Sequence, residues 1–457
     1  RKLATFSWAV LRPSVSIHWF RRDLRVSDNH GLYRALKEHG DVLPIFIFDT
    51  EILGRLEDKT DRRVDFIHRA LLRLKAELEG HGGSLLIEHG SPLEVWKRLI
   101  ARYQITGVTV NHDHEPYASV RDKAIEELLA GHGVPFNSYK DISIFERSEV
   151  VKDDGGPYTV FTPYGRKWRA RFTPDMVRAF PSTEHLDQLW RTAPLPSPTL
   201  QDLGFQPTDL VEPAIEVEEA LMRNYATTRN IPGIEGTSRM SVHLRFGTVS
   251  VRALMRQALT MSDTYMNELI WREFYMQMLW HFPHAVQGSF KPAYDRIEWR
   301  NDERQFQAWC EGRTGYPLVD AGMRELLATG HMHNRVRMVV SSFLTKHLLI
   351  DWRWGEAWFA RYLLDFELSS NNGGWQWASG GGCDAAPYFR VFNPTLQLGK
   401  FDPSLTYVKR WVKEYGTANY GRPIVVHEVA RKLAVETYKK ALDGSAKAER
   451  RQPQLFN

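Results

Sequence analysis

Between residues 15 and 140, short apolar runs alternate with longer amphipathic ones, and this alternation constrains the fold more than any other feature of the chain. The apolar runs predict strands at 15–20, 42–48, 84–88, 107–111 and 136–139. The segments between them predict helices at 29–39, 60–79, 92–103 and 119–131. Strands that alternate with helices form a parallel sheet covered on both faces, so we expect a five-stranded, doubly wound α/β domain over residues 15–140.

Polar side chains gather where the first and fourth predicted strands end. Arg21, Arg22 and Asp23 follow the first strand, and Asn111, His112, Asp113, His114 and Glu115 follow the fourth. Ligands of parallel sheets bind beyond the carboxyl ends of the strands. The first strand is not followed by G-x-G-x-x-G, which disfavours an ordinary dinucleotide site. The acidic, histidine-rich loop has residue types that bind metals, but no further ligand group stands nearby in sequence, so we expect no metal and a polar loop beside a small cofactor.

Residues 141–217 predict a long connector, because prolines recur from Pro157 to Pro213 and interrupt regular structure. Such a connector commonly wraps over a protein surface. Residues 218–457 predict a second, all-α domain, with helices at 221–231, 250–260, 263–280, 304–310, 322–328, 336–349 and 354–364. Residues 1–14 are expected to be a disordered lead outside the fold.

The composition narrows the classes of protein to which the chain can belong. A length of 457 residues suffices for two domains, and the net charge of +5 at pH 7 favours an anionic partner without proving one. The cysteines, Cys310 and Cys383, predict neither a disulfide framework nor a metal cluster, so we expect a reducing cytoplasm. No apolar run approaches the ~20 residues that a membrane span needs.

Most of the chain's 15 tryptophans lie between residues 260 and 411, and they are densest in the segment 352–397. A single tryptophan most often fills a core. This segment also carries Asn371, Asn372 and a run of glycines, which together predict a tight backbone presented to a planar ligand. No hydrolytic motif occurs in the chain, so the redox-active indoles point to electron transfer through a bound cofactor.

One predicted helix sets polar groups beside an aromatic ring. In NELIWREFYMQMLW, Glu268, Trp271 and Arg272 stand at positions i, i+3 and i+4 and therefore share one helix face. A carboxylate, an indole and a guanidinium can grip a base-like ligand by its edge, its ring face and its phosphate. An amphipathic core helix with a buried ion pair would show the same pattern, so both interpretations stay open.

Two further segments have groups suited to an aromatic or phosphate-bearing ligand. In MHNRVRM, Asn334 and Met338 stand four residues apart; an amide beside a thioether suits a flat ligand, although methionine often fills cores. In YATTRNIPGIEGTSRMSVHLRFG, a glycine precedes the hydroxyls of Thr237, Ser238 and Ser241. Hydroxyls and amides before a helix predict a cradle for pyrophosphate, and a plain N-cap explains the first two equally well.

The motifs IHWFRRDLRVSDN, GTSRMSVHLRFG, NELIWREFYMQM, TGYPLVDAGMREL, MHNRVRM and NNGGWQW resemble the photolyase/cryptochrome family in order and spacing. The resemblance extends from residue 15 to about 412. It implies an α/β antenna-binding domain joined by a long connector to a helical FAD-binding domain. The segments TGYPLVDAGMREL and DWRWG are similar to the corresponding segments of class III photolyases, the cyclobutane pyrimidine dimer photolyases nearest plant cryptochromes.

A few positions discriminate within the family. Asn334 and Met338 resemble dimer photolyases, whereas photolyases for 6-4 photoproducts carry histidines there. Asn371 is asparagine as in photolyases, whereas plant cryptochromes carry aspartate. Trp377 is usually absent from relatives that prefer single strands. His331 departs from the pattern, because a tryptophan usually stands there. The alternatives are a blue-light receptor and a 6-4 photolyase; a generic flavin oxidoreductase is disfavoured by the missing dinucleotide motif.

The implied reaction is the splitting of a cyclobutane dimer in ultraviolet-damaged DNA by an electron from photoexcited FADH⁻, with the dimer flipped out of the helix. By resemblance, the reaction site comprises Glu268, Trp271, Asn334, Met338, Asn371 and Trp377, and an electron relay comprises Trp299, Trp352 and Trp375. FAD would be held by Tyr225, Thr237, Ser238, Arg239, Met240, Ser241, Tyr265, Glu268, Arg272, Asn334, Asp365, Glu367 and Asn371. DNA would contact Arg229, Glu268, Trp271, Arg272, Asn334, Arg335, Trp377, Gln397 and Lys400.

The prediction of the antenna pigment depends on few residues. Glu115, beside His114, stands where folate-binding relatives place a carboxylate, which favours methenyltetrahydrofolate; a deazaflavin or no antenna stays open. We expect a monomer without membrane contact in a bacterial cytoplasm, associated with the nucleoid when on DNA.

Overall fold

The computed structural model describes residues 12–449, with side chains to residue 443. The chain divides into two compact units. The first unit comprises the residues up to Ile142 with Arg178–Thr208 and Phe246–Ala253; the second comprises Ser143–Val177, Asp209–Arg245 and the residues from Leu254 onward. Of the predicted lead, residues 1–11 lie outside the described residues. The domain boundaries at 140 and 217 stay a prediction.

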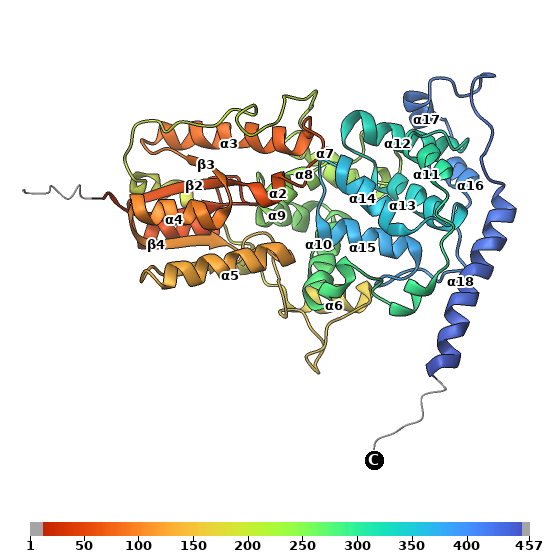
Figure 1. Cartoon of the computed structure of the whole chain (residues 1–457), viewed down its shortest axis with the longest axis horizontal. Coiled ribbons are helices and arrows are strands. Elements are labelled where there is room, and N and C mark those ends of the chain that lie inside the picture. Colours follow the sequence, from red (N-terminus) through yellow and green to blue (C-terminus); the bar gives the residue numbers. More distant parts are fainter. Residues whose placement is uncertain (1–11, 450–457) are drawn as a thin grey trace, which may run out of the picture. The chain divides into compact units, whose positions relative to one another are not determined.

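The first unit is built on a five-stranded parallel sheet with strand order β3-β2-β1-β4-β5 (Figure 1). The strands are β1 Ser14–Phe20, β2 Val42–Asp49, β3 Leu86–Gly90, β4 Gln104–Asn111 and β5 Phe136–Tyr139. Ile17 of β1 pairs with Leu43 on one side and Val108 on the other, and all three are fully buried. The predicted α/β class is therefore confirmed, because apolar runs buried on both faces specify central parallel strands.

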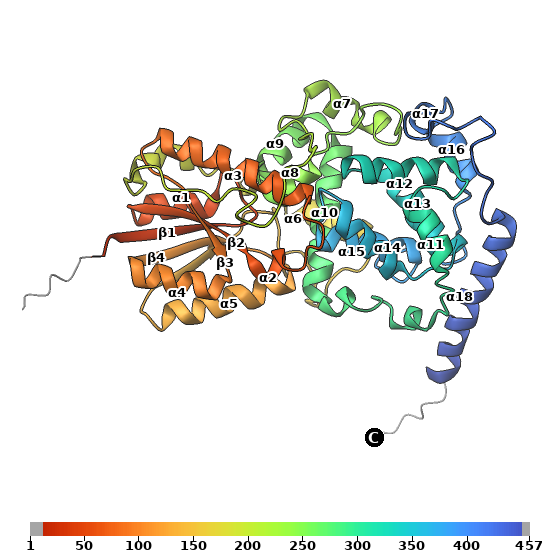
Figure 2. The same ribbon diagram turned by 45° about the horizontal axis from the view of Figure 1, so that its top comes forward.

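Four long helices cover this sheet: α1 His30–Glu38, α3 Arg62–Gly80, α4 Pro92–Arg102 and α5 Pro116–Ala130. In Figure 2, α4 and α5 lie along one face and α1 and α3 along the other. Asn29 and Asp61 cap α1 and α3, because their side chains accept hydrogen bonds from the backbone amides of Leu32 and Arg63. A short helix, α2 Thr50–Leu53, follows β2 and was not predicted.

The second unit is helical, as predicted. The helices are α6 Phe161–Arg171, α7 Glu219–Thr228, α8 Ser241–Phe246, α9 Val251–Met261, α10 Asp263–His281, α11 Glu303–Cys310, α12 Pro317–Thr329, α13 Asn334–Ser342, α14 Trp352–Tyr362, α15 Leu368–Ser379, α16 Pro394–Phe401, α17 Thr406–Trp411 and α18 His427–Glu449. Two of these helices, α8 and α9, include residues assigned to the first unit. Within residues 12–449, none of the helices combines the length and hydropathy that crossing a lipid bilayer requires.

The predicted connector is less irregular than its prolines indicate. It contains α6, where Pro163 lies in the first turn and its missing N–H removes no helical hydrogen bond. Trp168 of α6 is fully buried and donates to Oε2 of Glu273 on α10 at 2.6 Å. The expectation of irregular structure throughout this segment was therefore wrong at α6.

Two glycines of the tryptophan-rich segment lie where helices pack closely, whereas the sequence predicted a tight backbone presented to a planar ligand. Gly373 lies inside α15, and a Cβ there would stand 2.2 Å from the ring of Tyr275 on α10. Gly355 of α14 would likewise place a Cβ 2.1 Å from the ring of Trp375. Absence of a side chain at these two positions lets helices approach closely.

We expect Gly355→Ala to destabilise the protein by about 1–3 kcal/mol, because the new methyl group overlaps Trp375 and the side chain of Leu344. Urea unfolding followed by circular dichroism measures the change. Gly374→Ala is the matched control: a Cβ at Gly374 meets nothing within 4 Å. Alanine there should stabilise α15 by about 0.5–1 kcal/mol. Equal midpoints for both variants would contradict the packing argument.

The C-terminal helix α18 is anchored to a π-turn at Phe343–His347. Nζ of the buried Lys346 donates to the carbonyl of Ser379 at 3.0 Å and lies 3.5 Å from the ring centroid of Tyr438 on α18. Nε2 of His347 hydrogen-bonds Nδ1 of His427, the first residue of α18, at 2.9 Å. Burial, with the charge of His427, lowers the pKa of His347 to about 3.

We expect His347 to make the free energy of unfolding fall as the pH drops from about 6.5 toward 3, by up to about 1.4 kcal/mol per pH unit. Its folded pKa lies below its unfolded value, so the unfolded chain binds the proton first. Urea titrations of the wild type and His347→Gln across this range test the expectation. The stability difference between them should shift against the wild type as the pH falls; parallel curves would contradict it.

Candidate active site and cofactor site

The face of α10 that carries Glu268 is paired with a cation from α7. Nη1 of Arg229, the residue that ends α7, donates to Oε1 of Glu268. The side chains remain partly accessible, with 34% of Glu268 and 32% of Arg229 exposed. Burial raises the pKa of Glu268, and the charges of Arg229 and Arg335 oppose that rise. Arg229 thus has a protein partner as well as its predicted DNA role.

Trp271 is held from behind by an aromatic residue of α6. Its ring stacks on Phe161 with centroids 3.7 Å apart and an interplanar angle of 6°, and it meets Phe274 edge-on at 5.6 Å. Trp377 of α15 is half-buried and lies 6.3 Å from Phe392. Phe161 fixes the plane of Trp271, a role that no local sequence signal indicates, because the two residues are far apart in the chain.

The start of α13 presents polar groups to solvent while its arginine is held by the protein. Asn334 is exposed and Met338 is half-buried. Arg335 donates to Oδ1 of Asn230 at 2.8 Å and lies 4.6 Å from the ring centroid of Phe401. The direct hydrogen-bond partner of the Arg335 guanidinium is therefore neutral, and its charge acts on Glu268 without a hydrogen bond to that carboxylate.

The segment before α8 approaches two tyrosines. Oγ of Ser238 and the hydroxyl of Tyr265 on α10 are 2.9 Å apart, and Tyr265 meets Tyr225 of α7 edge-on at 5.0 Å. Arg239 has φ +54, a left-handed conformation that turns successive backbone amides toward one side. Its guanidinium pairs with Glu235 at 3.0 Å. Thr237, Met240 and Ser241 adjoin this turn, and the pyrophosphate cradle stays a prediction.

Two buried carboxylates lie on the chain between α14 and α15. Asp365 accepts two hydrogen bonds from Nη2 of Arg337, the shorter at 2.9 Å, and Glu367 lies 3.5 Å from Nε of Arg272. Burial works to raise the pKa of Asp365, but Arg337 holds it below its ordinary value. Ser241 also hydrogen-bonds Asp365, which ties the cradle to this carboxylate. Arg337 was not among the predicted site residues.

Asn371 is oriented by a glutamate that sequence reasoning missed. Its Nδ2 donates to Oε1 of Glu356 on α14 at 2.9 Å and to the Glu356 carbonyl at 3.2 Å. Burial raises the pKa of Glu356. Because both bonds take the amide N–H groups, Oδ1 of Asn371 stays available as an acceptor.

The predicted relay indoles belong to one apolar cluster of the helical unit. Trp352 and Trp375 are each 2% exposed, and Trp299 packs against the cluster. The indole N–H groups of Trp352 and Trp375 have no hydrogen-bond partner within the described part of the chain. Trp375 meets Trp309 edge-on at 6.0 Å. Close, dry aromatic packing of this kind suits electron transfer between rings.

His331, the departure from the family pattern, has a partner. Its Nδ1 lies 3.4 Å from Oε1 of Glu325, and Glu325 also accepts from the hydroxyl of Tyr407 at 2.5 Å. The imidazole therefore joins a buried polar group with Glu325 and Tyr407.

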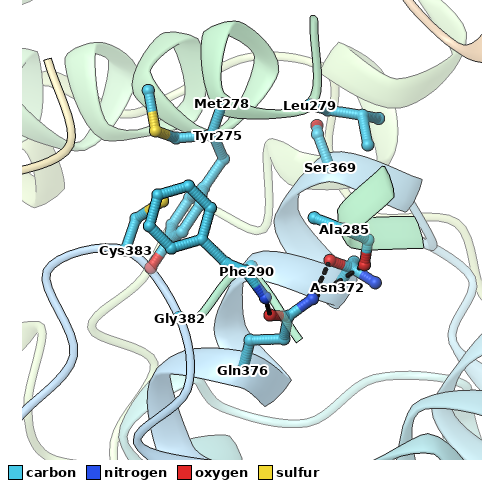
Figure 3. A pocket seen from close by; sticks show the side chains of 11 residues that line it. Tyr275, Met278, Leu279, Ala285, Phe290, Ser369, Asn372, Gln376, Gly382 and Cys383 are labelled. Carbon is cyan, nitrogen blue, oxygen red and sulfur yellow. Dashed lines mark hydrogen bonds between the residues drawn. The ribbon is translucent and has the colours of Figure 1, made fainter. Parts of the chain in front are cut away.

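A cavity lies between α10 and α15 (Figure 3). Its empty volume is about 350 Å³, part of it open to solvent. Gln376 spans one wall, accepting from the Phe290 amide at 2.6 Å and donating to Oδ1 of Asn372 at 2.9 Å. The lining residues are Tyr275, Met278, Leu279, Ala285, Phe290, Ser369, Asn372, Gly373, Gln376, Gly382 and Cys383. None of them is a predicted site residue.

In the α/β unit, the loops after β1 and β4 meet, as parallel topology requires. Nη1 of Arg22 lies 3.0 Å from Asp113 and 3.4 Å from Glu115, and Nδ1 of His114 lies 3.8 Å from Asp113. Nη1 of Arg21 pairs with Asp122 at 2.7 Å. Among residues 12–443, no group of histidine, cysteine and carboxylate side chains has an arrangement that could hold a metal ion.

Comparison with known proteins identifies related sequences and folds. The family described as DNA photolyase matches residues 16–184, and the FAD binding domain of DNA photolyase matches residues 265–419. A deoxyribodipyrimidine photo-lyase of Halobacterium salinarum is 38% identical, over 88% of this chain and 89% of its own length. The enzyme of that name from Synechococcus is 36% identical, over 91% and 94% respectively.

Solved structures extend the likeness to three dimensions. The class III photolyase of Agrobacterium tumefaciens has a TM-score of 0.83 and 32% identity, covering 96% of this chain and 100% of that one. An archaeal photolyase from Sulfolobus tokodaii, solved with two FAD molecules, has a TM-score of 0.79 and 31% identity, covering 93% and 99%. A Synechocystis cryptochrome, at 24% identity and a TM-score of 0.78 over 93% of this chain and 99% of that one, shares the fold.

Proposed function

The chain belongs to the DNA photolyase family, and on that premise we propose that it repairs DNA by light-dependent splitting of cyclobutane pyrimidine dimers. The observation that carries the proposal is the face of α10. There a half-buried carboxylate, Glu268, lies one helical turn from Trp271, whose ring is fixed by Phe161. The pair offers one edge-binding group and one flat apolar surface, which a flipped-out pyrimidine dimer requires.

The side chains fit FAD as the cofactor. The left-handed turn at Arg239, the hydroxyl pair Ser238–Tyr265 and the buried Asp365 are suited to a pyrophosphate and the sugar hydroxyls near it. We assign the binding to Tyr225, Thr237, Ser238, Arg239, Met240, Ser241, Tyr265, Glu268, Arg272, Asn334, Asp365, Glu367 and Asn371. When bound and reduced, FAD supplies on illumination the electron that opens the cyclobutane ring.

The protein's own residues bind and orient the lesion. Glu268 hydrogen-bonds the thymine edge and thereby stabilises negative charge as it develops there. Trp271 and Trp377 present apolar faces to the two bases, and Met338 packs beneath them. Asn334 contacts both lesion and cofactor, while Asn371, oriented by Glu356, tunes the cofactor without adding charge. Phosphates are contacted by Arg229, Arg335, Gln397 and Lys400.

Two alternatives within the family are disfavoured by single residues. A receptor of the plant cryptochrome type would carry aspartate in place of Asn371. A photolyase for 6-4 photoproducts would carry histidines in place of Asn334 and Met338. The asparagine at 371 and its tie to Glu356 favour repair.

The antenna pigment we propose is methenyltetrahydrofolate, bound near His114 and Glu115, where Arg22 compensates the acidic loop. We further propose that the protein acts as a monomer in the cytoplasm. The two free, buried cysteines agree with a reducing compartment.

The decisive experiment illuminates the purified, reduced protein with ultraviolet-damaged oligothymidylate and follows the return of absorbance at the thymine band. Recovery in blue light and none in darkness is the expected result. A duplex with a single 6-4 photoproduct serves as the second substrate and should remain unrepaired. Failure of absorbance to return under light with a reduced cofactor would overturn the proposal.

A further inference from the structure

Arg229 and Glu268 form an ion pair with each other, although the proposed function gives them different ligands. Arg229 is proposed to contact a DNA phosphate, and Glu268 a base of the lesion. Nη1 of Arg229 donates to Oε1 of Glu268, and the Glu268 carboxylate accepts no second hydrogen bond within residues 12–443. Each side chain is about one-third exposed, so the pair lies at the margin of the helical unit. Arg229 is the C-cap residue of α7 and forms no other ion pair within residues 12–443.

The neighbouring groups make Arg229 the principal counter-charge of Glu268. α7 also contributes Tyr225 and α10 contributes Tyr275, and burial raises the pKa of both phenols, so both are neutral near pH 7. α13 contributes Arg335, which hydrogen-bonds Asn230 and not the carboxylate. Burial raises the pKa of Glu268, and the two arginines oppose the rise, with Arg229 the stronger. Loss of Arg229 would therefore favour the neutral acid.

The edge of a thymine places an N–H donor beside a carbonyl acceptor. An ionised carboxylate can only accept hydrogen bonds, whereas a carboxylic acid accepts and donates at once and so satisfies both groups. An extra electron on the base strengthens this preference, because a fixed negative charge beside it is repulsive and a donated hydrogen bond is stabilising. The protonated form of Glu268 is thus the form complementary to the reacting lesion.

We propose that lesion DNA exchanges the partner of Arg229, from the Glu268 carboxylate to a DNA phosphate, and that Glu268 takes up one proton from solvent in the same binding step. No covalent bond forms or breaks except the new O–H bond of Glu268, and Arg229 stays charged throughout. Arg229 is thereby a positioning residue that couples phosphate binding to the protonation state of the group facing the base. The inference rests on the proposed function, since it requires a lesion in contact with Glu268.

The test is dark calorimetric binding of an oligonucleotide that carries one thymine dimer, in two buffers of different ionisation enthalpy at the same pH. We expect net proton uptake approaching one per complex for the wild type, and affinity that rises with falling pH by up to about tenfold per pH unit. Glu268→Gln, which mimics the neutral acid, should bind the lesion with no proton uptake attributable to this site and with a flat pH profile. Arg229→Gln should take up fewer protons on binding than the wild type, because without this counter-charge the free protein already favours the neutral acid.

Arg223→Gln is the matched control, because Arg223 lies on the same helix and pairs with Glu219 at 3.3 Å, away from Glu268. It removes the same charge and should keep the proton uptake of the wild type. If the wild type binds lesion DNA selectively and Glu268→Gln takes up the same number of protons, the exchange is wrong and the repair function stands. If no variant distinguishes damaged from undamaged DNA, the proposed function itself fails.

Discussion

Replacing Trp352 by phenylalanine is expected to reduce light-driven reduction of the bound, oxidised flavin to a small fraction of the wild-type rate, while repair by chemically reduced protein continues. Trp352 opens α14, and Gly355, one turn later, packs directly against the ring of Trp375. Both indoles are buried in the same apolar cluster. Phenylalanine keeps the aromatic packing but is far harder to oxidise than an indole, so the relay is interrupted without loss of the fold.

The measurement is the flavin absorbance of the oxidised protein under blue light with an external reductant. Trp358→Phe is the matched control: it lies on the same helix, packs against Tyr362 at 4.7 Å and Phe306 at 6.2 Å, and has no recorded contact with Trp375 among residues 12–443. Its rate of photoreduction should equal that of the wild type. Photoreduction of Trp352→Phe at the normal rate would remove Trp352 from the relay, and simultaneous loss of dithionite-driven repair would indicate a packing role instead.

The α/β unit could be predicted from the sequence because the signals for its strands and helices lie within short segments of the chain. Each strand is a short apolar run, and helix starts carry capping residues such as Asn29 and Asp61. In the helical unit, two predictions failed because single residues were interpreted without their neighbours. Prolines concealed α6, although Pro163 occupies a position where a helix tolerates it. The glycines of α15 were interpreted as a tight backbone presented to a planar ligand, whereas Gly373 lies inside the helix, where a Cβ would meet the ring of Tyr275.

The candidate site could be predicted only in part from such local patterns. Helical spacing placed Glu268, Trp271 and Arg272 on one face, but the roles of these residues came from family resemblance. The residues that hold them in place had no local signal: Arg229 stands 39 positions from Glu268, and Glu356 stands 15 positions from Asn371. Such pairs are created by tertiary packing, which no period of 2 or 3.6 residues can encode.

The predicted contacts of Arg335 and Arg229 with DNA stay a prediction, and the structure shows which protein groups hold each side chain. Arg335 was expected to meet phosphate, and the structure ties its guanidinium to Asn230 and to the ring of Phe401. Its neutral partners orient the charge without cancelling it, so the arrangement is compatible with a phosphate contact. Arg229, by contrast, has its charge compensated by Glu268, and for that residue a contact with DNA requires an exchange of partners.

Asp365→Asn is expected to yield a folded protein that has lost most of its FAD. Asp365 accepts two hydrogen bonds from Arg337 and one from Ser241 of the proposed pyrophosphate cradle, so one carboxylate fixes both a cation and the cradle. Asparagine has nearly the same shape but no charge, and its amide N–H groups face donors. Loss of a hydrogen bond to a charged group costs about 1.5–3 kcal/mol, so FAD affinity should fall roughly 10- to 150-fold.

The flavin-to-protein ratio after gel filtration, and titration of the apoprotein with FAD, measure this loss. Glu414→Gln removes a carboxylate from a comparable arginine pair, with Arg324 at 2.7 Å, on a part of the helical unit remote in sequence from the cradle. It should retain a full complement of FAD. Far-ultraviolet circular dichroism separates cofactor loss from unfolding. If Asp365→Asn is folded and binds FAD as tightly as the wild type, the carboxylate organises only the arginine, and the cradle must be fixed by the Ser238–Tyr265 pair alone.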